Sequence, residues 1–343
     1  MSSSTDRPPL GPEVEAFQPA PDPVQPGWQE NLFFILWDDS HDTGFLAHLQ
    51  RVPERGEQEA RVVVVVEGAV ASATIVGPYG PTPVPGLDVD FVDPFRRLRV
   101  RLESSLTAGE GPLGLLTLTA GGDVPASVDL HLESDLPVVD FAGPLDAMVS
   151  QMATNAGGPQ MGRQEHYEQG GRWQGSFRLG ERRVSGQGLF VRDHSWGIRH
   201  ERQDFKAFWT ASCLDRGRVF CNAIGIPTGD RIVGIGAVAD AEGVRFTTDV
   251  HARFRPEPGI ASYDSVDVHF GAGIDTTLQS RTRRHVPIPL PHSGPGRYDN
   301  NAISSVLMEG KVGFGVMEWA STFTDAEARA VGLAQAAAGG PGE

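Results

Sequence analysis

Short runs of apolar and aromatic residues, separated by polar turns, recur along the chain from Trp28 onward. The run at 31–37 ends at an Asp-Asp-Ser triplet, and its length fits a buried strand better than a helix. Residues 61–67 contain five consecutive valines, whose branched side chains favour extended backbone and whose lack of alternation indicates burial on both faces. The pattern predicts strands here, and further strands at 44–52, 98–103, 114–119 and 128–133.

The second half of the chain continues the same pattern. Residues 167–179 and 183–191 flank a Gly-Glu pair, which predicts a hairpin with its turn at 180–181. Regular spacing of short strands favours a sandwich or a barrel. The further strands are expected at 205–214, 218–226, 232–239, 244–254, 265–270, 302–309 and 312–319.

Helical signals are few. Three apolar side chains between 145 and 152 share one helical face, and a capping box at Thr324 and Glu327 predicts a terminal helix. With 343 residues we expect two β domains joined near 156–182. The predicted sections are a flexible leader at 1–27, an N-terminal β domain at 28–182, a C-terminal β domain at 183–323, and a terminal helix and tail at 324–343.

Composition narrows the possible partners. The formal net charge of −15 repels phosphate-rich molecules, so we expect no nucleic acid partner. No apolar run reaches the roughly 20 residues of a spanning helix, so we expect no transmembrane segment and a cytoplasmic location. The oligomeric state is left open. Cys213 and Cys221 are too few for a disulfide framework and are interpreted as small apolar fillers.

Motifs for common cofactors and nucleophiles are missing from the sequence. The histidines do not have the spacing of a helical zinc site, and no glycine-rich phosphate cradle or Gly-x-Ser-x-Gly elbow occurs. We therefore expect neither a metal nor a cofactor.

The stretch from Gly186 to Gly197 (GQGLFVRDHSWG) is the most informative segment. It resembles the Gly-x-Gly, aromatic, Asp-His-x-Trp-Gly signature of the carotenoid 1,2-hydratase and AttH-like superfamily, also called hydroxyneurosporene synthase-like, which includes lipocalin-like Diels-Alderases. Weaker similarity extends to 166–169 and 313–319. The resemblance implies an all-β fold of two lipocalin-like (calycin) antiparallel β-barrels packed together, with few short helices. The sequence departs from the hydratase pattern at Ser195 and Arg192.

An apolar barrel cavity suits acid catalysis on a lipophilic molecule. A carboxyl group on an apolar wall keeps its proton near neutral pH, so Asp193 is the leading proton donor, with His194 to orient or reprotonate it. Adjacent strand residues face opposite ways, so the two share a cavity only if the backbone turns there. Glu168 and Glu318, each beside an aromatic residue, are the alternative acids. The candidate substrate-binding residues are Trp196, Phe190, Tyr167, Phe208, Trp209, Arg192 and Arg199.

The preferred function is a cofactor-independent hydratase, isomerase or cyclase acting on an isoprenoid-like or polyketide-like substrate. The first alternative is a protein that binds or carries a lipophilic small molecule without turning it over. The second is that the Asp-His corner only shapes the fold, with Asp193 accepting backbone hydrogen bonds and Trp196 closing a barrel end.

Overall fold

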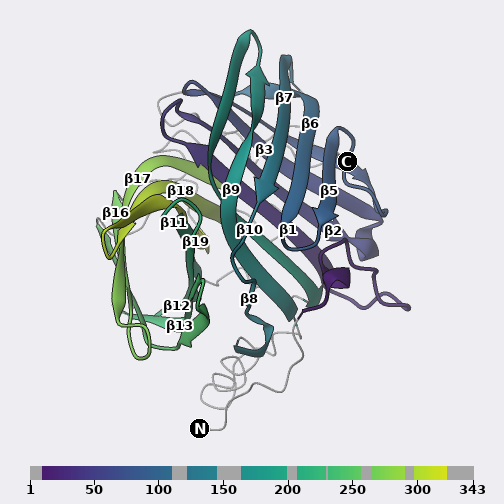
Figure 1. The fold of residues 1–343 in the computed structure, drawn as a ribbon. Coiled ribbons are helices and arrows are strands. Elements are labelled where there is room, and N and C mark those ends of the chain that lie inside the picture. The colour runs from purple at the N-terminus through teal and green to yellow at the C-terminus, as the bar shows by residue number, and fades with distance from the viewer. Residues whose placement is uncertain are drawn as a thin grey trace.

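The computed structural model describes residues 10–109, 122–144, 164–198, 207–228, 231–255, 264–289 and 297–322. Two antiparallel sheets, each curled into a barrel, stand side by side (Figure 1). Within the described residues, no helix is long and apolar enough to cross a membrane. The predicted all-β class and the two lipocalin-like barrels are confirmed.

The first sheet runs in the order β10-β1-β2-β3-β4-β6-β7-β9-β8, and the pairing of β9 with β10 closes it into a ring. Strand β5 pairs with β6 outside this path. Two short 3-10 helices, η1 (Pro12–Val14) and η2 (Pro53–Arg55), accompany this sheet. Its strands are β1 (Trp28–Asp38), β2 (Thr43–Val52), β3 (Glu57–Val66), β4 (Ala69–Pro78), β5 (Leu87–Asp93), β6 (Arg97–Ala108), β7 (Val124–Glu133), β8 (Val139–Asp140), β9 (Gln164–Leu179) and β10 (Arg182–Ile198).

The second sheet runs in the order β12-β11-β19-β18-β17-β16-β15-β13-β14, with β12 also pairing β13. Strands β13 and β15 pair at one position, Ile232 with Val250, so the ring has its shortest ladder there. The strands are β11 (Ala207–Leu214), β12 (Val219–Thr228), β13 (Arg231–Asp240), β14 (Gly243–Thr247), β15 (Val250–Arg255), β16 (Ser265–Phe270), β17 (Thr276–Pro289), β18 (Arg297–Met308) and β19 (Lys311–Thr322).

Three apolar cores hold the two barrels. One fills the first barrel, one fills the second, and the third, here called the inter-barrel layer, packs the outer face of one barrel on the other. The valine run shows why the layer forms. Val62 and Val64 point into the first barrel, whereas Val63 and Val65 point into the inter-barrel layer. Burial on both faces, predicted from the missing alternation, is confirmed.

The predicted hairpin is also confirmed, because Leu179 pairs with Arg182 across the turn and the ladder continues to Gln164 and Gly197. The domain boundary predicted between 182 and 183 falls inside this hairpin, just after its turn. Both of its strands belong to the first sheet, since β10 pairs with β1 as well as β9, so that sheet extends to Ile198.

Other predictions meet the structure unevenly. The single strand predicted at 244–254 is divided into β14 and β15. The strand at 114–119 and the helices at 145–155 and from 324 lie outside the described residues. The leader predicted at 1–27 needs a correction from residue 10 onward, because Glu15 is buried inside the first barrel, where it meets Arg192.

Both cysteines lie on the β11–β12 hairpin, but on opposite faces. Cys213 belongs to the inter-barrel layer and Cys221 to the core of the second barrel, and both are free thiols. Burial raises the pKa of Cys213 to about 12, so this thiol stays protonated and apolar in character.

Candidate functional site

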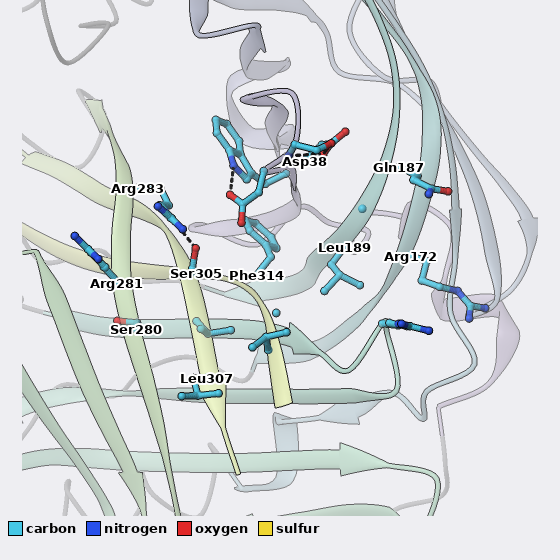
Figure 2. Close-up of a pocket in the computed structure, with 18 of the residues that line it drawn as sticks. Asp38, Arg172, Gln187, Leu189, Ser280, Arg281, Arg283, Ser305, Leu307 and Phe314 are labelled. Atoms are coloured by element: carbon cyan, nitrogen blue, oxygen red, sulfur yellow. Dashed lines mark hydrogen bonds between the residues drawn. The ribbon is translucent and has the colours of Figure 1, made fainter. Parts of the chain in front are cut away.

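An open cleft of about 970 Å³ lies between the two barrels. Figure 2 shows Leu189 and Arg172 on one side of it, and Ser305 and Phe314 on the other. We expected the cavity inside a barrel. The described interior of the first barrel is instead filled by its packed apolar core.

Strand β10 carries the Asp-His segment without a turn. Asp193 and His194 both keep regular pairing, with β1 on one side and β9 on the other. Successive side chains of a strand point to opposite faces. Asp193 therefore faces the second barrel, whereas Arg192 and His194 point into the first, and the expected cooperation of Asp193 with His194 is not possible in this geometry. The positive φ of Gly197 comes only after the pair.

The imidazole that meets Asp193 belongs to His166 on β9. Its Nε2 contacts Asp193 Oδ2 and lies 3.1 Å from Glu168 Oε1. His166 and Glu168 are two residues apart on one strand and so share a face. Side-chain exposure is 0% for Glu168, 5% for His166 and 16% for Asp193. We call this trio the His-Glu-Asp cluster; it runs from a buried carboxyl to a partly exposed one.

The second barrel holds Glu168 in place. Trp209 Nε1 donates to Glu168 Oε1 at 2.8 Å, and Asn222 Nδ2 donates to Oε2. Trp209 also packs edge-on against Phe33 at 5.6 Å, and Phe141 lies 5.5 Å from the His166 ring. The cluster thus has a polar anchor on one barrel and aromatic neighbours from both.

Burial and charge set the protonation of the cluster. Burial alone would lower the pKa of His166, but the Asp193 carboxylate and hydrogen bonds to Asp193 and Glu168 raise it to about 10. Burial raises the pKa of Glu168, although His166 opposes that shift. At neutral pH the His166 imidazole therefore carries a proton and lies between the two carboxyl groups.

The same three residues form a group that could bind a metal ion, found among the residues that the structure describes. His166, Glu168 and Asp193 each offer one ligand atom, and these atoms lie within 4.8 Å of one another. In the structure His166 Nε2 contacts both carboxyl groups. A metal ion bound to Nε2 would have to displace the proton on that nitrogen. Direct hydrogen bonding is the arrangement observed.

Glu318, the other alternative acid, lies close by. It pairs with Trp209 across the β11–β19 ladder, so both side chains emerge on the face that meets the first barrel. The structure thus brings four predicted residues to the inter-barrel layer: Asp193, Glu168, Trp209 and Glu318.

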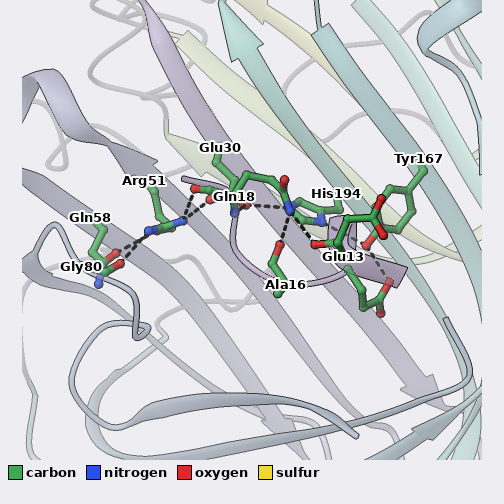
Figure 3. A network of polar contacts seen from close by, with 10 residues as sticks. Glu13, Ala16, Gln18, Glu30, Arg51, Gln58, Gly80, Tyr167 and His194 are labelled. Carbon is green, nitrogen blue, oxygen red and sulfur yellow. Dashed lines mark hydrogen bonds and ion pairs between the residues drawn. The ribbon is translucent and has the colours of Figure 1, made fainter. Parts of the chain in front are cut away.

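A second polar network fills one end of the first barrel (Figure 3). His194, fully buried, contacts Glu30 Oε1 at 2.8 Å through Nε2 and Tyr167 Oη at 3.0 Å through Nδ1. Glu30 also pairs with Arg51. Burial raises the pKa of the Tyr167 phenol, which stays protonated and donates to Glu15 Oε2 at 2.9 Å.

Arg192 completes this network. Its guanidinium donates to Glu15 Oε1 at 2.5 Å and to Gln169 Oε1 at 2.7 Å, with no exposed surface. Buried polar groups whose hydrogen-bond partners are all within the protein are typical of a structural core rather than a ligand site.

The remaining predicted residues divide between the two barrels. The ring of Trp196 lies 4.8 Å from that of His194 and is tilted by 50° to it, at the same barrel end. Phe190 belongs to the core of the first barrel and Phe208 to that of the second. Arg199 lies outside the described residues.

His166 and Asn222 were not predicted as site residues. A usable signal existed for His166, because a turn at 180–181 sets the register of the whole hairpin and places Asp193 opposite Glu168. His166 then falls beside them on the same face. Asn222 contacts the cluster from the other barrel, and no local sequence pattern predicts that contact.

Comparisons with known proteins agree with this architecture. An AttH-like protein from Nitrosomonas europaea superposes with a TM-score of 0.60 at 15% identity, covering 93% of this chain and 100% of that one. CghA aligns with TM-scores of 0.48 alone and 0.47 with Sch210972, at 11% and 12% identity, covering 86% and 87% of this chain and 88% and 89% of CghA.

The fold that the sequence resemblance predicted is thus shared with the AttH-like protein. No curated protein sequence matches the chain. One family model, described as a domain of unknown function (DUF7064), matches residues 11–322. Since that match spans most of the sequence, this protein belongs to the DUF7064 family.

Proposed function

We propose that this protein is a cofactor-independent hydratase, isomerase or cyclase that transfers a proton at the His-Glu-Asp cluster to a lipophilic substrate of isoprenoid-like or polyketide-like chemistry. The observation that supports this most is that one imidazole contacts two carboxyl groups that differ in burial. His166 joins the fully buried Glu168 to the partly exposed Asp193.

Each member has a separate task in this proposal. Glu168, held by Trp209 and Asn222, orients the imidazole. His166 stores the proton, and Asp193, the most exposed of the three, delivers it to a substrate carbon.

The reaction then follows the fate of the cation. Protonation of a carbon–carbon double bond leaves a carbocation on the neighbouring carbon. Attack by water gives hydration, loss of a proton gives isomerisation, and attack by a second double bond before that loss gives a ring. In each case a proton returns to the cluster. In this proposal the rings of Phe33, Trp209 and Phe141, which lie around the cluster, stabilise the cation.

Deuterium incorporation tests this directly. The protein is incubated in D2O with isoprenoid alcohols and polyenes, and with any apolar molecule that native mass spectrometry finds bound to it. We expect deuterium in the product with the wild type and a loss of about 10²-fold or more with Asp193→Asn and His166→Gln. Asp129→Asn, at a partly exposed β7 position, serves as the matched control.

The outcomes separate the hypotheses. Deuterium uptake that is unchanged in Asp193→Asn and His166→Gln removes the cluster from the chemistry. Retained ligand affinity, with no turnover by the wild type on any compound, indicates the carrier function. A large drop in melting temperature for Asp193→Asn, with binding lost, indicates a role in folding alone. Repeating the assay after EDTA treatment shows whether a metal ion takes part.

A further inference from the structure

The cleft between the barrels carries four arginines, although the whole chain has a formal net charge of −15. Arg172 comes from β9, Arg216 from the β11–β12 turn, and Arg281 and Arg283 from β17. Figure 2 shows Arg281 and Arg283 across the cleft from Arg172. Positive side chains therefore face the cleft from both barrels.

The acidic residues of the cleft are already engaged. Asp38 contacts His41 Nδ1 at 2.7 Å and accepts from the Ser40 backbone, and Asp39 accepts from Trp37 Nε1 at 3.0 Å. These two carboxylates are thus turned to their own loop rather than to the arginines.

Three of the four guanidinium groups still have N–H donors that bind no carboxylate among the described residues. Arg172 forms exposed ion pairs with Asp135 and Glu133. Among the described residues, Arg216, Arg281 and Arg283 have no carboxylate partner, and Arg283 donates only its Nε, to Ser305 Oγ at 2.7 Å. Its terminal nitrogens can still bind a carboxylate or phosphate.

The turn that carries Arg216 is held in an unusual conformation. Asp215 and Arg216 have φ values of 49° and 57°, and Gly217 follows at 86°. A Cβ at Gly217 would lie 2.8 Å from Arg172 Cγ, so this glycine lets the turn pack directly on Arg172. Left-handed backbone at a non-glycine residue costs free energy and is concentrated at functional sites. The turn thus places Arg216 at the same cleft as Arg172.

Part of the cleft lining is apolar. Val312 is 69% exposed and Leu307 39% exposed, and Leu189 is half-buried beside them. Trp37 and Phe314 lie buried at the same cleft. Exposed aliphatic side chains rimmed by charges are typical of ligand grooves.

We propose that this cleft binds an amphipathic anion, whose apolar chain lies on Leu307 and Val312 and whose carboxylate or phosphate head is bound by Arg281 and Arg283. A volume of about 970 Å³ is ample for one such molecule. The site is distinct from the His-Glu-Asp cluster, because Leu189 and Asp193 are about 13 Å apart along β10, with the buried Val191 between them. The proposed anion binding does not depend on whether the His-Glu-Asp cluster is catalytic.

Calorimetric titration tests the proposal with three probes of equal chain length: dodecanoate, dodecyl phosphate and dodecyltrimethylammonium, each below its micelle concentration. We expect the two anions to bind at least about tenfold more tightly than the cation. Whichever anion binds more tightly identifies the headgroup as carboxylate or phosphate. Affinity should fall as the salt concentration rises.

Two sets of variants locate the contacts. Arg281→Gln/Arg283→Gln should weaken anion binding by at least about tenfold. Arg253→Gln, at an exposed β15 position outside the cleft, should leave it unchanged. Val312→Ser should reduce the gain in affinity from octanoate to dodecanoate, which is at most about fourfold per methylene.

Equal binding of the cation and the anions overturns the proposal, and so does unchanged affinity in the double arginine variant. All four side chains are exposed or lie at the surface of the cleft, so circular dichroism melting should show that each variant folds. A common loss of affinity in Arg253→Gln and the double variant also overturns it, because general surface charge would then explain the binding.

Discussion

Replacing Glu15 by Gln is expected to destabilise the protein by about 3–5 kcal/mol, because the change leaves the guanidinium of Arg192 buried without its counterion. Exposure of the two side chains is 1% and 0%. Glu15 Oε1 accepts from Arg192 at 2.5 Å, and Oε2 accepts from Tyr167 at 2.9 Å. The isosteric amide keeps the shape of the side chain, so the loss measures charge rather than packing.

Urea denaturation followed by tryptophan fluorescence gives the free energy of unfolding. Asp129→Asn is the matched control, because it removes a carboxylate from an ion pair with Arg99 whose side chains are 36% and 42% exposed. That pair is expected to be worth about 0–1 kcal/mol. Combining Glu15→Gln with Arg192→Met should recover part of the loss, since the buried charge is then gone. A loss for Glu15→Gln no larger than the control's would refute the argument that an unpaired buried charge dominates.

Two further predictions concern the inter-barrel layer. The folded pKa of His166 is raised to about 10, above its unfolded value, so its stabilisation is fully present below about pH 6.5 and is lost as pH rises through about 10. Urea denaturation at pH 6, 8 and 10 should show a steeper fall for the wild type than for His166→Gln, and equal slopes would contradict this. Trp209→Phe removes the donor to Glu168 and should cost about 1–3 kcal/mol. Trp173→Phe is its control, since the buried Trp173 Nε1 has no partner among the described residues, and equal losses for both variants would show that the Glu168 hydrogen bond adds nothing.

Local patterns were sufficient to predict many of the strands, but not β4, β5 or β17. The valine run predicts a strand because branched side chains favour extended backbone. The Gly-Glu pair predicts a hairpin because it fits a tight turn between two strands. The long hairpin that follows from the turn also determines which residues of β9 and β10 lie opposite each other. The lipocalin-like architecture came from the short motif at 186–197 by resemblance, not from periodicity.

The candidate site was only partly predictable. Asp193 was identified from the Asp-His motif as a carboxyl on an apolar wall, and Glu168 separately as a carboxyl beside an aromatic residue. The sequence suggested His194 as the partner because it is adjacent, but adjacency along a strand separates side chains. The pairing of Glu15 with Arg192 joins residues 177 positions apart, and that of Glu168 with Asn222 joins two barrels. Such contacts arise from packing and have no signature in a single sequence.

The alternation of β10 limits how this family can change length. Even-numbered positions from 190 to 194 stabilise the inside of the first barrel, and Val191 and Asp193 face the second barrel. Inserting or deleting one residue before Asp193 would exchange the two sets, sending a carboxylate into the first barrel's core and a guanidinium toward the second. We therefore expect homologous chains to differ here by substitution, with gaps confined to the turn at 180–181, where a changed loop leaves the strand's facing intact.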